Sequence, residues 1–499
     1  PKRSSWAGKV QGNLRENPMK KIVSLAIAGM LLAATAQAGS FTEKNAEKAK
    51  NIIDKAVEAH GGEDLIDNMK TIVVELEGFT YSVGQSRGTE APWDKTYEKG
   101  YDAIDLENEV FVRHRTSHGE SFAANFTNIL NGEESYNLDY RRGTVAKVAE
   151  PDYENATGPL IRVTPALLVR TLKEREANAH YLGEVEADGE MFDVVGFSMT
   201  VGPAINMYFD KKTHVLRRSE RMFAGYGVVG YHFDDYKSMK GVPFHQTFTL
   251  FLNGETNSKR KILSVEVNTP IDEYLEIDER LAAIPAVEPD PLARHELGDG
   301  VWLVGGNNTY AMFVDMGDYL FAAGGVGGMP AKIALMREAV GDKPIRYGML
   351  THHHSDHTMG ITAYEDEGAT LIASAAHEKV VREAAQDGDK LKVKAVDDRM
   401  VLEDGGRRVE IIDIGPTAHT EHLLVAYLPE EELIFEADHF TMPATGPAAP
   451  ANKGASTFAE ALARQDIKIS RIATAHSARV ATMDDLARAL EAEVFQAMR

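Results

Sequence analysis

The feature that most constrains this chain is a cluster of metal-binding side chains in six consecutive positions. Residues 352–357 read His-His-His-Ser-Asp-His, which contains the pattern H-x-H-x-D-H. The apolar run that ends at Thr351 predicts a strand directly before it, and the next residues predict a helix. His352 and His354 are two apart and can point toward one metal ion. Asp356 and His357, in the following turn, can reach a second ion. Such donors suit zinc, with iron, manganese or cobalt as alternatives.

Three further donors follow, each after a predicted strand or a short turn. His419 lies in the segment Gly-Pro-Thr-Ala-His-Thr, Asp438 follows the apolar run Leu-Ile-Phe-Glu-Ala, and His476 follows Ile-Ala-Thr-Ala. A single histidine of this kind is ordinarily a core residue. Donors at the C-terminal ends of strands, however, are where α/β folds place their sites. The segments therefore predict one shared site.

The motif and the order of these donors resemble the metallo-β-lactamase superfamily over residues 296–499. The resemblance implies an αβ/βα sandwich, in which two sheets lie between helices. It also implies that His419 completes the first metal site, that Asp438 bridges both ions and that His476 completes the second site. All seven positions of the expected ligand set are then filled: His352, His354, Asp356, His357, His419, Asp438 and His476.

The resemblance also implies a catalytic role for this centre. Two divalent ions about 3.5–4 Å apart hold a water as hydroxide near neutral pH, and that hydroxide attacks a carbonyl carbon or a phosphorus. Asp356 is the predicted catalytic residue, because it can relay the proton of the nucleophile. His422 and His439 are weaker candidates for contacts to the substrate or to the ligands. Two departures from the family pattern stand out: residues 320–324 lack the usual Asp, and Ser477 replaces a Gly.

The reaction class follows partly from what the chain lacks. It contains no cysteine, whereas one β-lactamase subclass requires a cysteine ligand. Another subclass generally lacks the bridging Asp that Asp438 would supply. The ligand set instead resembles that of hydrolases of esters, lactones, thioesters or amides. Two alternatives stay open: a mono-iron sulfur dioxygenase of the same fold, and a lipid- or lipoprotein-binding carrier whose metal domain is not catalytic.

The front part, residues 40–285, carries a different pattern. A helical stretch ends at Gly61-Gly62, and alternating runs such as Thr71–Tyr81 then predict an α+β domain on a curved antiparallel sheet. The pattern is similar to the half-barrels of periplasmic lipoprotein carriers of the LolA/LolB type, which implies an apolar or lipid ligand. A structural or dimerisation module is the alternative. Three prolines within residues 285–291 predict a linker over 286–295, between the two domains.

The N-terminus and the net charge bear on location and partners. Within residues 1–38, Met19-Lys20-Lys21, an apolar run and Ala36-Gln37-Ala38 predict a signal peptide over 19–38, a mature start near Gly39 and a periplasmic or secreted protein. The apolar run is shorter than a membrane span, so no stable span is expected after cleavage. The chain carries a formal charge of −22, and removing residues 1–38 leaves 48 basic and 75 acidic residues, or −27. Such a surface repels nucleic acid, so the expected partner is a small-molecule substrate. The sequence leaves the oligomeric state open.

Overall fold

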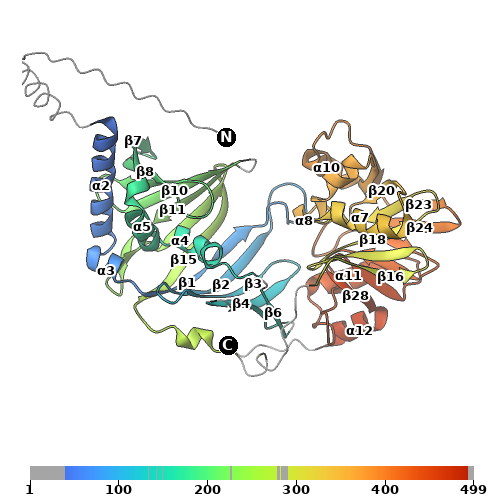
Figure 1. Ribbon diagram of the computed structural model, residues 1–499. Helices are drawn as coiled ribbons and strands as arrows, with labels where there is room; N and C mark the ends of the chain where they lie inside the picture. The colour runs from blue at the N-terminus through green and yellow to red at the C-terminus, as the bar shows by residue number, and fades with distance from the viewer. Residues whose placement is uncertain are drawn as a thin grey trace, which may run out of the picture.

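The computed structural model describes residues 40–492, except for 133, 142, 149, 225–226, 278–280 and 282–289. The predicted signal peptide over 19–38 lies outside the described residues, as do residues 286–289 of the predicted linker. Two bodies lie side by side (Figure 1): a large curved sheet with helices, built from the first half of the chain, and a layered α/β body built from the second half.

The first body is organised by one antiparallel sheet. Among the described residues, thirteen strands form it in the order β6-β5-β4-β3-β2-β1-β15-β14-β11-β10-β9-β8-β7, and β12 and β13 form a separate hairpin. The strands are β1 (Thr71–Tyr81), β2 (Lys95–Asp105), β3 (Val110–His118), β4 (Ala123–Asn131), β5 (Glu134–Asp139), β6 (Thr144–Lys147), β7 (His180–Ala187), β8 (Glu190–Phe197), β9 (Ile205–Asp210), β10 (Leu216–Phe223), β11 (Gly227–Asp234), β12 (Lys237–Met239), β13 (Val242–Phe244), β14 (Thr247–Leu252) and β15 (Glu255–Val267).

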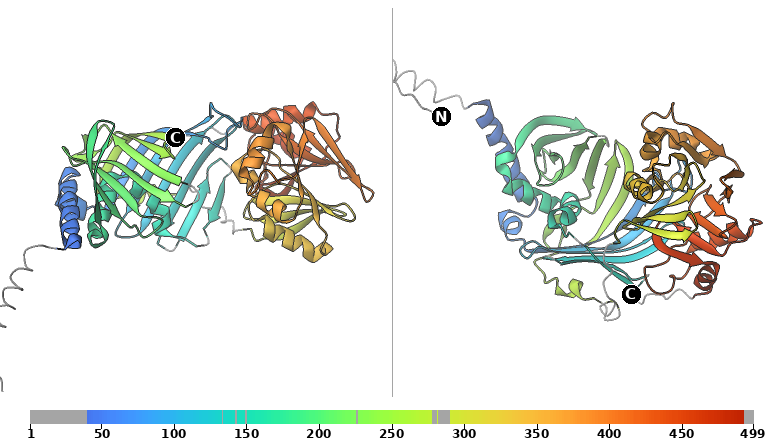
Figure 2. Two further views of the ribbon diagram at one scale, coloured as in Figure 1. Left: turned by 90° about the horizontal axis from the view of Figure 1, so that it is seen from above. Right: turned by 45° about the vertical axis from the view of Figure 1, so that its right-hand side comes forward.

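Helices cover one face of this sheet, which curves around them (Figures 1 and 2). They are α2 (Phe41–Ala59), α3 (Glu63–Asp67), α4 (Tyr153–Val163) and α5 (Pro165–Glu174), followed by the short 3-10 turns η1 (Glu176–Asn178) and η2 (Asp272–Leu275). Ser40 caps α2 in a reciprocal capping box with Glu43. The buried side of α2, with Ile53, packs into the same apolar core as Ile72 and Leu76 of β1. The predicted large antiparallel sheet is confirmed, whereas the likeness to lipoprotein carriers is not.

A groove of about 770 Å³ lies on the sheet around β1, β2, β3, β14 and β15. Phe79 and Tyr97 contribute aromatic surface to it, but eight of its sixteen lining residues are charged. A charged wall is costly to cover with an acyl chain, because the charged groups would lose their hydration. The groove therefore combines charged groups with aromatic surface, and the apolar or lipid ligand implied by the carrier resemblance stays a prediction.

Charged side chains that are buried in the N-terminal sheet form a compact cluster on β2 and β3. The Asp102 carboxylate accepts from Arg113 Nε and from an Arg115 guanidinium nitrogen, each at 2.7 Å. The Asp102 and Arg115 side chains are almost fully buried. Burial tends to raise the pKa of Asp102, but the two arginines outweigh it and hold this pKa below its ordinary value. The cluster is thus a satisfied ionic network inside the sheet.

The second body consists of two sheets, which are β16–β22 and β23–β28 in that order. The first contains β16 (Ala293–Gly298), β17 (Val301–Gly306), β18 (Thr309–Asp315), β19 (Leu320–Ala323), β20 (Ile345–Met349), β21 (Thr370–Ser374) and β22 (Val393–Val396). The second contains β23 (Arg399–Asp404), β24 (Arg407–Asp413), β25 (Leu424–Leu428), β26 (Leu433–Glu436), β27 (Arg471–Thr474) and β28 (Ser477–Thr482). β16 begins at Ala293, within the last residues of the linker predicted over 286–295.

Helices lie on both outer faces of this pair of sheets. The helices are α7 (Met329–Val340), α8 (Ser355–Thr358), α9 (Ile361–Asp366), α10 (Glu378–Ala384) after the turn η3 (Ala375–His377), α11 (Lys453–Ala463) and α12 (Met483–Glu491). One apolar core joins the two sheets to α7 and α9, with Phe313 and Phe435 at its centre. A second core packs α11 and α12 on the other sheet, around Phe458. This is the predicted layer order.

The helix predicted directly after the His-rich strand end is two helices, α8 and α9. The break falls at Met359 and Gly360, and the Gly360 N–H donates to the Gly325 carbonyl at 2.7 Å. A Cβ at position 360 would lie 2.7 Å from Met329 Cγ and 3.0 Å from the Gly325 carbonyl carbon. The glycine-rich turn after β19 therefore occupies the space that a side chain would need. No helix within the described residues is long and apolar enough to span a membrane.

Candidate metal centre

The His-rich segment occupies the turn between β20 and α8. His354 is the residue before α8, and Asp356 lies in the first turn of that helix. The side chains of His352, His354 and His357 are buried, whereas Asp356 stays about half exposed. The turn is fixed to the second sheet, because Leu424 N donates to the Thr351 carbonyl at 2.8 Å. The segment is therefore a rigid part of the sheet edge.

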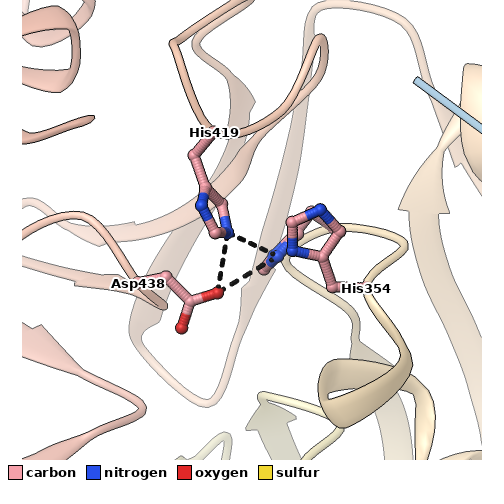
Figure 3. A group of neighbouring side chains, drawn as sticks. His354, His419 and Asp438 are labelled. Carbon is pink, nitrogen blue, oxygen red and sulfur yellow. Dashed lines mark hydrogen bonds and ion pairs between the residues drawn. The ribbon is translucent and has the colours of Figure 1, made fainter. Parts of the chain in front are cut away.

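One group of donors comprises His352, His354, His419 and Asp438. The Nε2 atoms of His352 and His419 lie 3.2 and 2.9 Å from Asp438 Oδ2. These two nitrogens are 3.2 Å from each other. Figure 3 shows the rings of His354 and His419 directed at the Asp438 carboxylate from different segments of the chain. The donors converge on one small volume.

The second group comprises Asp356, His357, Asp438 and His476. The Nε2 atoms of His357 and His476 lie 3.0 and 2.6 Å from Asp438 Oδ1 and 3.3 Å from each other. Asp356 Oδ2 lies 3.3 Å from His357 Nε2 and 4.0 Å from His476 Nε2. Each oxygen of Asp438 thus faces a different group.

These spacings fit a pair of metal ions. Two nitrogens bound tetrahedrally to one zinc at its usual bond length are about 3.3 Å apart, close to the distances between paired imidazoles here. The two ring nitrogens of His354 also indicate a metal site. Its Nε2 is hydrogen-bonded, whereas its Nδ1 is buried without a hydrogen-bond partner among the described residues. A buried lone pair of this kind is costly unless a cation or proton uses it. The donor set therefore fits two divalent cations.

Hydrogen bonds on the outward side orient four of the imidazoles. His352 Nδ1 lies 3.1 Å from Thr351 Oγ1, and His476 Nδ1 lies 2.9 Å from the Asn308 carbonyl oxygen. The partners of His354 and His419 come from the N-terminal sheet: the Ser86 carbonyl oxygen, 3.0 Å from His354 Nε2, and Ser121 Oγ, 3.2 Å from His419 Nδ1. Such contacts set the tautomer of a metal-binding histidine and the direction of its ring.

The pKa values of the histidines in the site are shifted in different directions, so some rings are neutral and others protonated. Burial, reinforced by the neighbouring His419, lowers the pKa of His354 to about 3. Burial also lowers the pKa of His352 well below its ordinary value. For His357 burial acts the same way, but Asp438 and Asp356 outweigh it and raise its pKa to about 10. Metal-free protein is thus expected to hold a proton at His357 where the second group would hold a cation.

Metal binding should therefore depend on pH. The raised pKa of His357 stabilises the metal-free fold below the ordinary histidine pKa, and this contribution is lost as pH rises through about 10. A metal ion needs the neutral ring, so binding releases this proton. Burial tends to lower the pKa of His476, but its contact with Asp438 outweighs burial and raises it. Between pH 6 and 8 we therefore expect the affinity of the second group for zinc to rise about tenfold or more per pH unit. Calorimetry in buffers of different ionisation enthalpy counts the released protons, and a count of zero would contradict the expectation.

The turn that presents Asp438 is held by groups that the sequence analysis missed. The buried Glu436 carboxylate accepts from the N–H groups of His439 and Phe440, at 3.0 and 3.2 Å. His439 Nε2 lies 2.9 Å from Thr417 Oγ1, which also accepts from His419 N at 3.1 Å. The turns of Asp438 and His419 are therefore tied together. An acidic residue inside an apolar strand was the available signal for Glu436.

The two weaker candidates lie in different places. His439 is buried against the His419 ring, with centroids 5.1 Å apart, so it supports a ligand and does not line the mouth. His422 Nδ1 donates to the Asp413 carboxylate at 2.9 Å, and its ring lies edge-on to that of His377. It belongs to neither donor group. The structure brings the other seven predicted residues together.

Comparisons with known proteins agree with this architecture. Residues 302–478 match the family model described as the metallo-beta-lactamase superfamily. The C-terminal region therefore has the metallo-beta-lactamase fold. No curated protein matches the chain.

Solved structures of metallo-beta-lactamases resemble part of the chain. A metallo-beta-lactamase from Pontibacter korlensis is 16% identical, with a TM-score of 0.34, and the match covers 40% of this chain and 98% of that one. The metallo-beta-lactamase FIM-1 from Pseudomonas aeruginosa, in a mono-zinc form, is 18% identical, with a TM-score of 0.32 and coverages of 40% and 94%. A metallo-beta-lactamase from Hirschia baltica is 21% identical, with a TM-score of 0.31 and coverages of 40% and 96%.

Proposed function

We propose that this chain is a metal-dependent hydrolase that holds two divalent ions, zinc in the first place, and cleaves an ester, lactone, thioester or amide. The observation that carries the proposal is the shared carboxylate of Asp438, with one oxygen in each donor group. The first ion would be held by His352, His354, His419 and Asp438, and the second by Asp356, His357, Asp438 and His476. The match of residues 302–478 to the metallo-beta-lactamase superfamily supports the same reading.

Side chains around the donor groups would hold the ions, exclude water and accept a proton in the proposed reaction. When bound, two such ions would lower the pKa of a water molecule so that it can act as the nucleophile near neutral pH, and would polarise the bond under attack. The buried rings of His352, His354 and His357 keep bulk water from the inner side of the site. Asp356 is the half-exposed acid at the mouth: Oδ1 accepts from Gln85 at 2.7 Å, and Oδ2 faces the second group. In the proposed reaction Asp356 takes a proton from the nucleophile, and its partial exposure and its contact with the second group support this role.

The experiment that tests the proposal is metal analysis followed by a substrate panel. Elemental analysis of protein starting near Gly39 should give close to two divalent ions per chain. The protein should then hydrolyse at least one member of an ester, lactone, thioester and β-lactam panel, and lose this activity with a chelator. One iron per chain with no hydrolysis would instead favour the sulfur dioxygenase.

We also propose that the protein is exported, on the basis of the signal-like residues 19–38. The N-terminal sequence of the protein recovered from the periplasm or medium would start near Gly39. A carrier function of the N-terminal domain predicts co-purifying lipid. Lipid-free protein by mass spectrometry would argue against that function.

A further inference from the structure

Two loops of the N-terminal sheet reach the metal centre. One joins β1 to β2 over residues 82–94, and the other joins β3 to β4 over residues 119–122. In Figure 1 the first loop extends from the blue strands to α8. Backbone hydrogen bonds attach these loops to the metal-binding segments: Ser355 N to Gly84 O at 3.0 Å, Glu421 N to Arg87 O at 3.0 Å and Gly454 N to Ser121 O at 3.2 Å.

Three further contacts go to the proposed ligands themselves. Gln85 Nε2 donates to Asp356 Oδ1 at 2.7 Å, and thereby leaves Oδ2 directed at the second group. Ser121 Oγ lies 3.2 Å from His419 Nδ1 and leaves Nε2 in the first group. The Ser86 carbonyl binds His354 Nε2 at 3.0 Å, which leaves Nδ1 free to face the centre. Each contact is made to the side-chain oxygen or nitrogen of a proposed ligand that does not point into its donor group.

The longer loop is braced from within. Arg87 pairs with the Asp94 carboxylate through two guanidinium nitrogens, at 2.9 and 3.1 Å. Ser86 Oγ donates to the Ser82 carbonyl and accepts from Asp94 N, both at 2.9 Å. The Ser86 carbonyl is therefore held in place before any ion binds, and a preorganised acceptor costs little reorganisation on binding.

We propose that the N-terminal sheet is a working part of the metal centre, and that Gln85 and Ser121 are positioning residues, Gln85 for Asp356 and Ser121 for His419. The inference rests on the proposed function in that the same seven residues hold the ions. Outer partners of metal ligands commonly contribute 10–100-fold to metal affinity. Here those partners come from a different domain, so the centre is complete only when the two bodies are in contact.

The test compares Gln85→Met and Ser121→Ala with a matched control in the full-length mature protein. Glu120→Gln is the control, because Glu120 pairs with Lys453 across the same interface at 3.1 Å but is not in either donor group. Zinc affinity is measured by competition with a chromophoric chelator, and the cobalt-substituted proteins are compared by their visible absorption. We expect Gln85→Met to weaken one ion about tenfold or more, Ser121→Ala to weaken the other to a similar degree, and both to alter the cobalt spectrum. Glu120→Gln should stay within about twofold, as expected for an exposed pair.

The outcomes separate this inference from the proposed function. Unchanged zinc affinities and spectra in both variants would overturn it, and so would equal losses in all three proteins, because the effect would then reflect docking alone. Because Gln85 is exposed, Gln85→Met is expected to fold normally, and its zinc affinity tests the inference even if Ser121→Ala misfolds. A wild-type protein that binds two ions and hydrolyses nothing would remove the proposed function and leave the inference standing.

Discussion

Replacing Asp438 with alanine is expected to weaken both metal ions at once and to reduce hydrolysis on the order of 10³-fold or more. The carboxylate places one oxygen 2.9–3.2 Å from the nitrogens of His352 and His419, and the other 2.6–3.0 Å from those of His476 and His357. Its removal deletes a donor and a negative charge from each group. Several kcal/mol of transition-state stabilisation come from such ions, and each 1.36 kcal/mol is a factor of ten in rate.

Asp356→Ala is the comparison variant for this prediction, because it is expected to affect one metal ion and not both. Asp356 belongs to the second group only, so its variant should keep the first ion and lose affinity for the second. Elemental analysis and chelator competition give the ion count, and kcat/KM on a responsive ester or lactone gives the rate. Two tightly held ions and normal turnover in Asp438→Ala would exclude the shared-carboxylate arrangement.

The largest expected effect on stability is in the N-terminal sheet. Asp102→Asn removes the charge that neutralises Arg113 and the buried Arg115 between β2 and β3, and leaves Arg115 with the more distant Glu98 carboxylate at 4.0 Å. Breaking a buried ion pair in this way costs about 3–5 kcal/mol. The low pKa of Asp102 adds a pH signature: its contribution is present above the ordinary aspartate pKa and is lost as pH falls through the lower folded value.

Hydrogen-exchange mass spectrometry resolves this effect by region, which matters because two domains need not unfold together. Exchange in β2 and β3 should accelerate in Asp102→Asn, while the strands of the metal-binding domain stay protected. The matched control is Glu107→Gln, whose ion pair with Lys70 is more than half exposed on both sides and should contribute within about 1 kcal/mol. Equal protection in Asp102→Asn and the wild-type protein would show that the cluster is not a stability determinant.

The sequence by itself determined the centre of the metal site. Four donors within six residues leave the backbone little freedom, and Asp438 and His476 follow strands whose ends meet at one sheet edge. The β1 strand was placed at its observed bounds, Thr71–Tyr81, although buried and exposed side chains do not alternate regularly along it. Strands β2 and β15 escaped notice, since glycine, lysine and buried polar residues interrupt their alternation.

Only the tertiary structure decided what surrounds those donors. Gln85 and Ser121 lie 271 and 298 residues before the side chains they touch, and nothing in a glutamine or a serine marks it as a ligand's partner. The break at Gly360 depends on the glycine-rich turn that packs against it from another strand. The local sequence shows which side chains can bind a cation, because a cation needs particular donor atoms close together. The residues that support those donors depend on which distant loops the packing of the two domains brings within hydrogen-bond distance, and no local pattern encodes that packing.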